Sequence, residues 1–274
     1  MAIKKIKYHT AISFLEEIQT VGNSPIKVLA DDYKFYFVKN NSGKTPAYYL
    51  INEVLAHYFL KIWHIPTPEI AIINVNPEFL LPTYSNRHKP HYYSYPVFGS
   101  SLVPQATDLN ALFSINSKSD YNKFDSPENI FHIGLFDLWL ENDDRKPTNN
   151  NLLLQPFNGK QRITAIDHSF IFSTLDYQSL DPKNFCPIAN DNIFLTDLAI
   201  SLKEGKKKNK NWGSEDREYF YLCIQNCKKH YSEIVKNIPK EWGFTPQLKI
   251  KLKNFLFNKK RLEKVFIEYI HKMN

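Results

Sequence analysis

A run of carboxylate and amide side chains lies between two apolar stretches near the middle of the chain. The run, Asn142–Asn151, holds Asp144 and Asn149, and a later stretch, Arg162–Ile166, ends directly before Asp167. Carboxylate and amide oxygens are the ligands that Mg²⁺ prefers in proteins, usually together with phosphate oxygens and water. These residues could therefore hold a magnesium ion, provided that the fold brings Asp167 to the polar run.

The residues that follow the polar run predict a β-hairpin that would bring Asp167 to this run. Leu152–Leu154 and Arg162–Ile166 have the composition of strands, and Asn158-Gly159 between them is a strong signal for a tight turn. Pairing the strands about this turn returns the chain to the end from which the hairpin starts. The sequence thus predicts a magnesium site at that end, with Asp167 beside the polar run.

The spacing within the polar run also meets a requirement of phosphoryl transfer. This reaction needs a metal ion that neutralises the phosphates, a cation on the phosphate tail and a carboxylate near the incoming nucleophile. In protein kinases the catalytic Asp precedes a metal-binding Asn by five positions, and the interval from Asp144 to Asn149 is the same. Asn149 and Asp167 are therefore the predicted ligands. Asn151, directly before the first strand, is the alternative to Asn149.

A lysine nearer the N-terminus could supply the cation for the phosphates, and a glutamate could hold it in place. Lys39 ends the predicted strand Phe35–Lys39, and Glu53 lies in a predicted helix from Leu50 to Trp63, at the border of its apolar stripe. From that border Glu53 can reach the preceding strand. The two residues resemble the strand lysine and helix glutamate of kinases.

A turn ahead of the first predicted strand could cover a nucleotide. Gly22-Asn23-Ser24-Pro25 directly precedes the strand Ile26–Ala30. Successive backbone N–H groups in such a turn can bind phosphate, so Ser24 is a predicted nucleotide-binding residue.

The elements that must position these residues are a mixture of strands and a helix in the first part of the chain. Period-two and four-residue patterns predict two strands, a helix and a strand in the order β-β-α-β, at Ile26–Ala30, Phe35–Lys39, Leu50–Trp63 and Glu69–Val75.

Later in the chain helical patterns dominate. Ser126-Pro127-Glu128 has the composition of a helix start, and this helix is expected to run to about Glu141. Beyond residue 190 helical spacing prevails, interrupted by a charged loop at Lys203–Lys210. The predicted class is α+β.

Six short motifs occur in the order seen in the HipA-like kinase domain family, within about residues 15–175. They are Gly-Asn-Ser-Pro at 22–25, Phe-Val-Lys ending at Lys39, Asn52-Glu53, Ile65-Pro66-Thr67-Pro68-Glu69, the Asn142–Leu153 run and Ile166-Asp167-His168. On these motifs the chain resembles the family. The resemblance implies a bilobal protein-kinase-like fold, with a small β-rich N-lobe at residues 1–96 and a larger, mainly helical C-lobe at residues 97–274.

The resemblance also implies ATP and Mg²⁺ as cofactors. Asp144 would be the catalytic base, Asn149 and Asp167 would bind the metal, and Lys39, held by Glu53, would bind the phosphates. The expected activity is ATP- and magnesium-dependent phosphoryl transfer to an alcohol, in a serine/threonine protein kinase of toxin-related type with an antitoxin as partner.

Two alternatives stay open at this point. Arg145 after Asp144 also resembles phosphoinositide kinases, which favours a small-molecule or lipid-head-group kinase, so that the phosphate acceptor is either a protein or a small molecule. A pseudokinase-like binding module is the non-enzymatic alternative, although such a module has no chemical need for Lys39, Glu53 and the metal ligands together.

Composition and charge limit which binding partners and which cellular location are expected. Thirty-five Lys and Arg against 28 Asp and Glu give a net charge of +7, which favours anionic partners such as nucleotides. The basic run Lys206–Lys210 is more typical of a solvated loop than of a nucleic-acid site, so nucleic acid is not expected as a partner. The sequence has three cysteines, no signal-peptide pattern and no apolar stretch that could span a membrane; the expected location is cytoplasmic.

Overall fold

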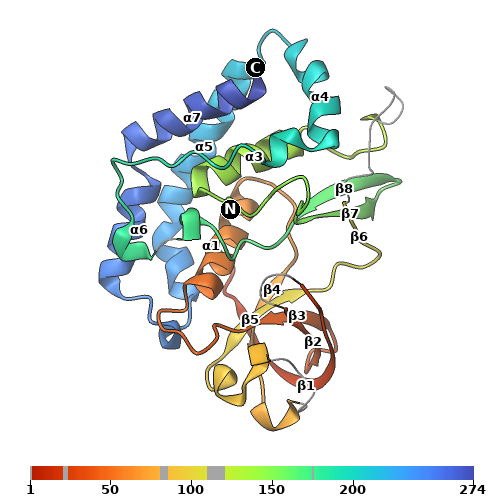
Figure 1. Ribbon diagram of the computed structural model, residues 1–274, viewed down its shortest axis with the longest axis vertical. Helices are drawn as coiled ribbons and strands as arrows, with labels where there is room; N and C mark the ends of the chain where they lie inside the picture. Colours follow the sequence, from red (N-terminus) through yellow and green to blue (C-terminus); the bar gives the residue numbers. More distant parts are fainter. Residues whose placement is uncertain (1, 21–23, 81–85, 110–120, 175) are drawn as a thin grey trace. The chain divides into compact units, whose positions relative to one another are not determined.

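The structure is a computed structural model that describes residues 2–20, 24–80, 86–109, 121–174 and 176–274 (Figure 1). By its internal contacts the chain forms two compact units, and it passes between them more than once. Unit 1 comprises Met1–Tyr58, Pro68–Val103 and Ser232–Pro246, and unit 2 comprises Phe59–Thr67, Pro104–Tyr231 and Gln247–Asn274. The two units contain both strands and helices, which confirms the α+β class. The division into lobes at residues 96 and 97 stays a prediction.

Unit 1 is built around a closed barrel of five strands (Figure 1). These are β1 (Lys7–Glu17), β2 (Ile26–Ala30), β3 (Phe35–Lys39), β4 (Ile70–Asn74) and β5 (Val97–Ser101). They follow one another around the barrel in the order β1-β2-β3-β5-β4, and β1 pairs with β4 in parallel to close it. The predicted strands that correspond to β2, β3 and β4 are confirmed.

β1 is a strand that the sequence patterns did not predict. Only Ala11 of its residues is buried, and its pairing with β2 is irregular between Ala11 and Ser13 and again between Phe14 and Glu16. Such bulges break the alternation of inward and outward side chains by which a strand is recognised. The predicted β-β-α-β order is therefore wrong by one strand, and the observed order is β-β-β-α-β.

The barrel is filled by small and branched apolar side chains together with two tyrosines. They are Ala11, Ile26, Val28, Ala30, Tyr36, Val38, Ala71, Ile73, Val75, Tyr93 and Val97. Alternate residues of β2 and β3 contribute to this core, as the pleat of a strand requires. The helix α1 (Tyr48–Ile62) belongs to unit 1 as far as Tyr58. Trp242 joins the segment 232–246 to the same unit, because its Nε1 donates to Pro96 O at 2.7 Å.

Unit 2 contains a small sheet and most of the long helices. The sheet consists of β6 (Thr107–Asp108), β7 (Leu152–Phe157) and β8 (Lys160–Ala165), and the helices are α3 (Asn129–Leu140), α4 (Asp197–Lys207), α5 (Trp212–Ile234), α6 (Pro246–Leu256) and α7 (Lys259–Met273). The predicted hairpin is confirmed as β7–β8. Its turn residues Asn158 and Gly159 have φ of 49° and 76°, the left-handed values that a two-residue turn of this kind needs.

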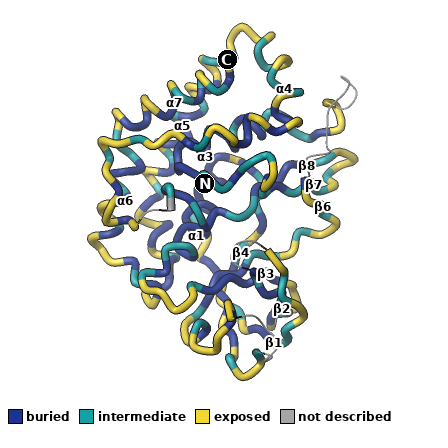
Figure 2. Tube along the Cα trace, viewed as in Figure 1, coloured by how far each residue is buried: buried dark blue, intermediate teal, exposed yellow. Residues whose placement is uncertain are grey.

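An aromatic cluster forms the centre of unit 2. Trp63 stacks on Trp139 with 5.6 Å between ring centroids, and Phe136 and Phe220 meet Trp63 edge-on. α3, which carries two of these rings, is buried along nearly its whole length (Figure 2) and packs against α7. No helix in the described part of the chain is long and apolar enough to cross a membrane.

Two expectations for the helices are corrected. α3 begins at Asn129 rather than within Ser126–Glu128, which form a turn closed by the bond from Asn129 N to Ser126 O. The charged loop expected at Lys203–Lys210 is shorter, because residues 203–207 are helical in α4. Lys206 Nζ is held at 2.9 Å from the buried Asp216, and Lys207 Nζ donates to the backbone oxygen of Asn274.

Candidate active site

Lys39 and Glu53 form a buried ion pair in unit 1. Lys39 Nζ lies 2.6 Å from Glu53 Oε1, and the two side chains are 9% and 6% exposed. Burying two charges costs several kcal/mol per ion before their attraction offsets it, so such a pair is a poor source of stability. A requirement for a fixed ammonium group explains it better. The structure brings the two residues together, and their role toward a nucleotide stays a prediction.

The pair follows from the patterns of β3 and α1. Tyr36 and Val38 of β3 point into the barrel core, so Lys39 belongs to the opposite face of the strand. Glu53 stands directly before Val54 in α1, and both residues are buried. The helix therefore presents a carboxylate at the edge of its apolar stripe, within reach of the end of β3.

Ser24 is held inside its own loop. Its backbone N–H donates to Thr20 Oγ1 at 3.0 Å, its hydroxyl group donates to Thr20 O at 3.2 Å, and Arg87 Nη1 donates to the hydroxyl oxygen at 2.7 Å. The residue is buried, with a left-handed backbone (φ 39°). Gly22 and Asn23 of the predicted phosphate-binding turn lie outside the described residues. The nucleotide contact of Ser24 stays a prediction.

The polar run begins in unit 2, where α3 ends. Glu141 caps the helix in the left-handed conformation, with φ of 52°. The chain then turns back onto α3, because Asn142 Nδ2 and Arg145 Nε donate to the two carboxylate oxygens of Asp137 at 2.9 and 2.8 Å. Complete burial raises the pKa of Asp137, and the Arg145 guanidinium and the Asn142 amide oppose that rise.

Arg145 joins the segments at both ends of the β7–β8 hairpin. Its side chain is completely buried, at 0% exposed. Nη1 donates to the backbone oxygens of Asn150 and Asn151 ahead of β7. Nη2 donates to Ile166 O at 3.3 Å and lies 2.9 Å from His168 Nε2, both beyond β8. One guanidinium group thus fixes the polar run against the segment that carries Asp167.

Asp144 lies between two asparagine amides. Asn149 Nδ2 donates to Asp144 Oδ1 at 3.2 Å and to its backbone oxygen at 3.1 Å, and Asn151 Nδ2 donates to Asp144 Oδ2 at 3.1 Å. Both oxygens of the carboxylate are therefore oriented by the loop. Asp144 itself is half-buried, Asn149 is exposed and Asn151 is half-buried.

The hairpin brings Asp167 to this loop. Leu152 pairs with Ala165 in the sheet, and one position further Ile166 N donates to Asn151 O at 3.1 Å. Asp167 follows directly. Asn151 and Asp167 both have left-handed backbones, with φ of 47° and 53°, a conformation that Asn and Asp adopt more readily than other residues with a side chain.

The donor set of this loop fits a hard divalent cation. Because Asn149 and Asn151 turn their Nδ2 atoms toward Asp144, their Oδ1 oxygens point away from it. Asp167 adds a carboxylate at the adjoining strand end. Carboxylate and amide oxygens are the ligands that Mg²⁺ takes together with phosphate and water.

Comparison with known families decides the kind of protein that carries this loop. The model of the HipA-like kinase family matches residues 12–267. The chain belongs to the HipA-like kinase family. The crystal structure of a Helicobacter pylori proinflammatory kinase, CtkA, is similar, with a TM-score of 0.55 at 12% sequence identity over 98% of this chain and 99% of that chain. That likeness shows the fold alone. No curated protein matches the chain.

As a HipA-like kinase the protein is an enzyme that transfers a phosphoryl group. Membership of a kinase family implies the use of ATP and usually of a divalent metal ion, and the oxygen-rich loop is chemically suited to such an ion. The kinase assignment favours the enzyme over the binding module without activity. The resemblance seen in the sequence motifs is thus confirmed at the level of the family.

Several supporting residues of this HipA-like kinase loop were not predicted from the sequence. They are Asp137, Asn142 and Asn150. The position of Arg145 at the centre of the hydrogen bonds of this loop was not predicted either. One signal could have revealed them. Asp137 is the only acidic residue in the mainly apolar segment Asn129–Leu140, and a carboxylate buried in such a helix requires a cation or donors. Arg145 is that cation.

Arg145→Lys is expected to destabilise the HipA-like kinase and to lower its activity. An ammonium group cannot bond to α3, the polar run and the β8 end at once. Loss of two hydrogen bonds to a charged group, at about 1.5 kcal/mol or more each, would lower the Tm by roughly 6–12 °C. Differential scanning calorimetry measures this shift.

Arg162→Lys is the matched control for this change. Arg162 pairs with Asp125 at 3.3 Å on the surface of the same unit, and both side chains are partly exposed. Surface ion pairs contribute about 0–1 kcal/mol, so the control should shift the Tm by no more than about 4 °C. Equal shifts in Tm for the two variants would contradict the conclusion that Arg145 holds the loop together.

Proposed function

We propose that the protein transfers the γ-phosphoryl group of ATP, in the presence of Mg²⁺, to a hydroxyl group, with Asp144 as the catalytic base. One observation carries this proposal. Asp144 is held by two asparagine amides in a loop whose backbone is bonded to the strand end that precedes Asp167. A carboxylate for the nucleophile next to oxygen ligands for a metal ion is the arrangement that phosphoryl transfer requires.

The proposed metal ligands are Asp167 and Asn151, with Asn149 as the alternative to Asn151. The five-residue interval in the sequence favours Asn149. Two contacts favour Asn151: its backbone oxygen accepts from Ile166 N, directly before Asp167, and from the buried Arg145. Asn149, by contrast, is exposed, and its backbone bonds to Lys146 within the turn.

In this proposal each residue of the chain has a distinct task. Mg²⁺, when bound, neutralises charge on the phosphate oxygens. Asp144 accepts the proton of the attacking hydroxyl group, and the two amides that donate to its oxygens hold the carboxylate in one orientation. Lys39 binds the phosphates through its ammonium group, and Glu53 fixes the position of Nζ.

The proposed acceptor is a serine or threonine hydroxyl group of a protein. This choice follows the family resemblance, as do a bilobal arrangement, a toxin-related role and an antitoxin partner, all of which stay predictions. A small-molecule or lipid-head-group acceptor is the alternative, because Asp144 is followed by Arg145 as in phosphoinositide kinases. The chemical form of the labelled product separates these classes.

Transfer from radiolabelled ATP tests the proposal. The purified protein would be incubated with [γ-³²P]ATP, Mg²⁺ and a cell lysate, and the product divided into acid-precipitated protein, organic-phase lipid and soluble small molecules. Label in protein that survives acid but not alkali is expected, as for phosphoserine and phosphothreonine. EDTA should abolish it. If only the lipid or the soluble fraction were labelled, the acceptor would be a lipid or a small molecule instead of a protein. The absence of magnesium-dependent label from every fraction would contradict the proposal.

The choice between Asn151 and Asn149 gives a further prediction. Asn151→Gly and Asn149→Gly each remove one amide from Asp144, so the difference between them reports the metal ligand. Glycine also accepts the left-handed backbone of residue 151 without strain. Asn151→Gly should raise the Mg²⁺ concentration for half-maximal activity by about tenfold or more, equivalent to about 1.4 kcal/mol. Asn149→Gly should leave it nearly unchanged, and the reverse result would restore Asn149.

A further inference from the structure

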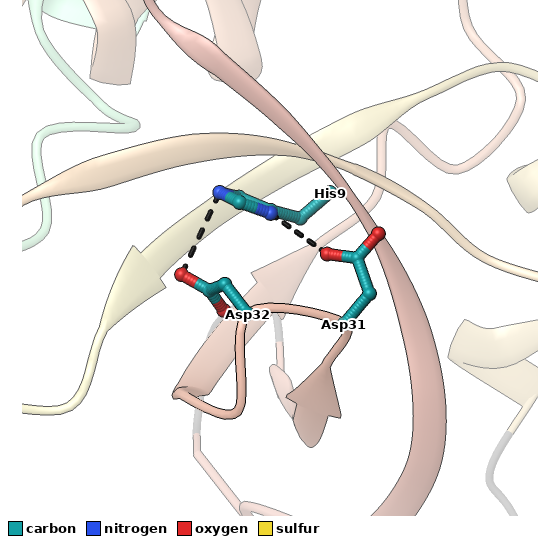
Figure 3. A group of neighbouring side chains, drawn as sticks. All are labelled: His9, Asp31 and Asp32. Carbon is teal, nitrogen blue, oxygen red and sulfur yellow. Dashed lines mark hydrogen bonds and ion pairs between the residues drawn. The ribbon is translucent and has the colours of Figure 1, made fainter.

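Three ionisable side chains meet at the seam of the barrel in unit 1. They are His9 of β1 and the neighbouring Asp31 and Asp32 of the turn between β2 and β3 (Figure 3). Each residue has a nitrogen or oxygen atom within 4.8 Å of those of the other two. None of the three belongs to the polar run or to the Lys39–Glu53 pair.

The topology of the barrel creates this meeting point. Residues 7–10 of β1 pair with β4, and from Ala11 onward β1 pairs with β2. His9 lies just before this change of partner, and Asp31 follows the last residue of β2. Asp31 N donates to Thr10 O at 2.9 Å and Thr10 N donates to Asp31 Oδ2 at 3.1 Å. The turn is thus fastened to β1 beside His9.

The two nitrogens of His9 have different surroundings (Figure 3). Nδ1 lies 2.7 Å from Asp31 Oδ1, a normal hydrogen-bond distance, whereas Nε2 lies 3.5 Å from Asp32 Oδ2. A carboxylate bonded to Nδ1 fixes the proton there and leaves the lone pair of Nε2 to face outward, as in the carboxylate–histidine–metal arrangement. Here Nε2 faces the Asp32 carboxylate.

Aromatic packing and a hydroxyl group hold the other side of the cluster. The Tyr36 ring stacks on His9 with 6.1 Å between centroids, and Tyr36 Oη donates to Asp32 Oδ2 at 3.0 Å. The imidazole and the carboxylate are therefore positioned by groups other than each other. This is the kind of support that keeps metal ligands in place.

The cluster carries an excess of negative charge. The ammonium group of Lys34 lies 3.8 Å from Asp32 Oδ2, and its side chain is 66% exposed. An exposed pair of this kind contributes little. Two carboxylates with one imidazole between them would therefore gain from a cation at the position between Nε2 and Asp32.

We propose that His9 Nε2 and the Asp32 carboxylate bind a divalent transition-metal ion of the Zn²⁺ class, with Asp31 orienting His9 from behind. An imidazole nitrogen suits Zn²⁺ and its neighbours, whereas Mg²⁺ and Ca²⁺ prefer oxygen ligands only. In a tetrahedral site with bonds of 2.0–2.1 Å, two ligand atoms lie about 3.3 Å apart, close to the 3.5 Å between Nε2 and Oδ2. Water would complete the coordination.

The ion would act as a clamp on the barrel. It would link β1, where that strand changes its partner, to the β2–β3 turn. Because a metal ion that binds only the folded state stabilises it, unit 1 should gain resistance to heat. The site rests on residues of the barrel alone, so it does not depend on the proposed roles of Asp144 and Asp167.

Calorimetric titration with Zn²⁺ tests the site. The full chain would be titrated without nucleotide and in excess Mg²⁺, which occupies sites made only of oxygen ligands. His9→Gln and Asp32→Asn should each bind one equivalent less than the unaltered protein, while Asp31→Asn should keep the site with about 10–100-fold lower affinity. Asp32→Asn also retains an oxygen that can accept from Tyr36, which protects the fold.

His271→Gln is the matched control. His271 lies 3.9 Å from a single carboxylate, that of Glu268, and is exposed on α7, so its loss should leave the stoichiometry unchanged. Zn²⁺ should also raise the Tm of the unaltered protein but not that of Asp32→Asn. Equal stoichiometry in the unaltered protein, His9→Gln and Asp32→Asn would overturn the site, as would a Tm increase that Asp32→Asn retains.

Discussion

Asp167→Asn is expected to weaken the binding of Mg-ATP by about 100-fold or more while the protein stays folded. A metal ion that polarises phosphate oxygens contributes several kcal/mol, and a 100-fold change corresponds to about 2.7 kcal/mol. Asparagine is a sharper choice than alanine, because it keeps the shape of the side chain and tolerates the left-handed backbone of residue 167 (φ 53°). Isothermal titration with Mg-ATP measures the loss.

Asp181→Asn is the control for this change. Asp181 Oδ1 accepts from Lys183 N at 2.9 Å, as Asp167 Oδ1 accepts from Ser169 N at 3.5 Å, so each aspartate supports a turn two residues ahead. Asparagine can accept the same bond in both places. The control should bind Mg-ATP normally. Unchanged affinity in a folded Asp167→Asn protein would remove Asp167 from the metal site.

The parts of the site that the sequence predicted are those fixed by local chemistry. Asn158-Gly159 sets the turn, the turn sets the register of β7 and β8, and that register delivers Asp167 to the polar run. In the same way, the pleat of β3 and the stripe of α1 place Lys39 opposite Glu53. Each step needs only a short-range pattern, which is why the sequence alone predicts that these residues come together.

The parts that the sequence did not predict depend on contacts between distant segments. The sequence marks Arg145 only as the residue after Asp144, and the neighbouring residues do not indicate that it is buried against Asp137 and the end of β8. The bulged β1 lacks a clean alternation. The cluster of His9 with Asp31 and Asp32 exists only because β1 changes partner beside the β2–β3 turn.

The choice between Asn149 and Asn151 shows how the two kinds of information combine. Counting residues from Asp144 favours Asn149, since the interval matches that of protein kinases. Measuring from the hairpin favours Asn151, since that residue is bonded to the strand end next to Asp167. A loop with extra residues changes the count but not the register of the sheet, so we give the hairpin more weight.

Asp144→Asn is expected to lower kcat by about 10²–10⁴-fold, the range for loss of a positioned general base, while the KM for ATP changes little. An amide cannot take the proton of the acceptor hydroxyl group. It can still accept from one of Asn149 and Asn151 but not from both, because its NH₂ group faces the second donor. The lost hydrogen bond should cost about 0.5–1.5 kcal/mol, which a modest fall in Tm would report separately from the loss of rate.

Asp143→Asn completes the experiment, because the neighbouring Asp143 accepts from Ala189 N at 2.8 Å and an amide oxygen can replace that acceptor. Its kcat should stay within about threefold of the unaltered protein, because the amide oxygen keeps the bond from Ala189 N. If Asp144→Asn lost ATP binding and turnover to the same extent, Asp144 would belong with the metal ligands. If both variants retained full kcat, proton removal would not limit the reaction and the acceptor hydroxyl group would need no base from this loop.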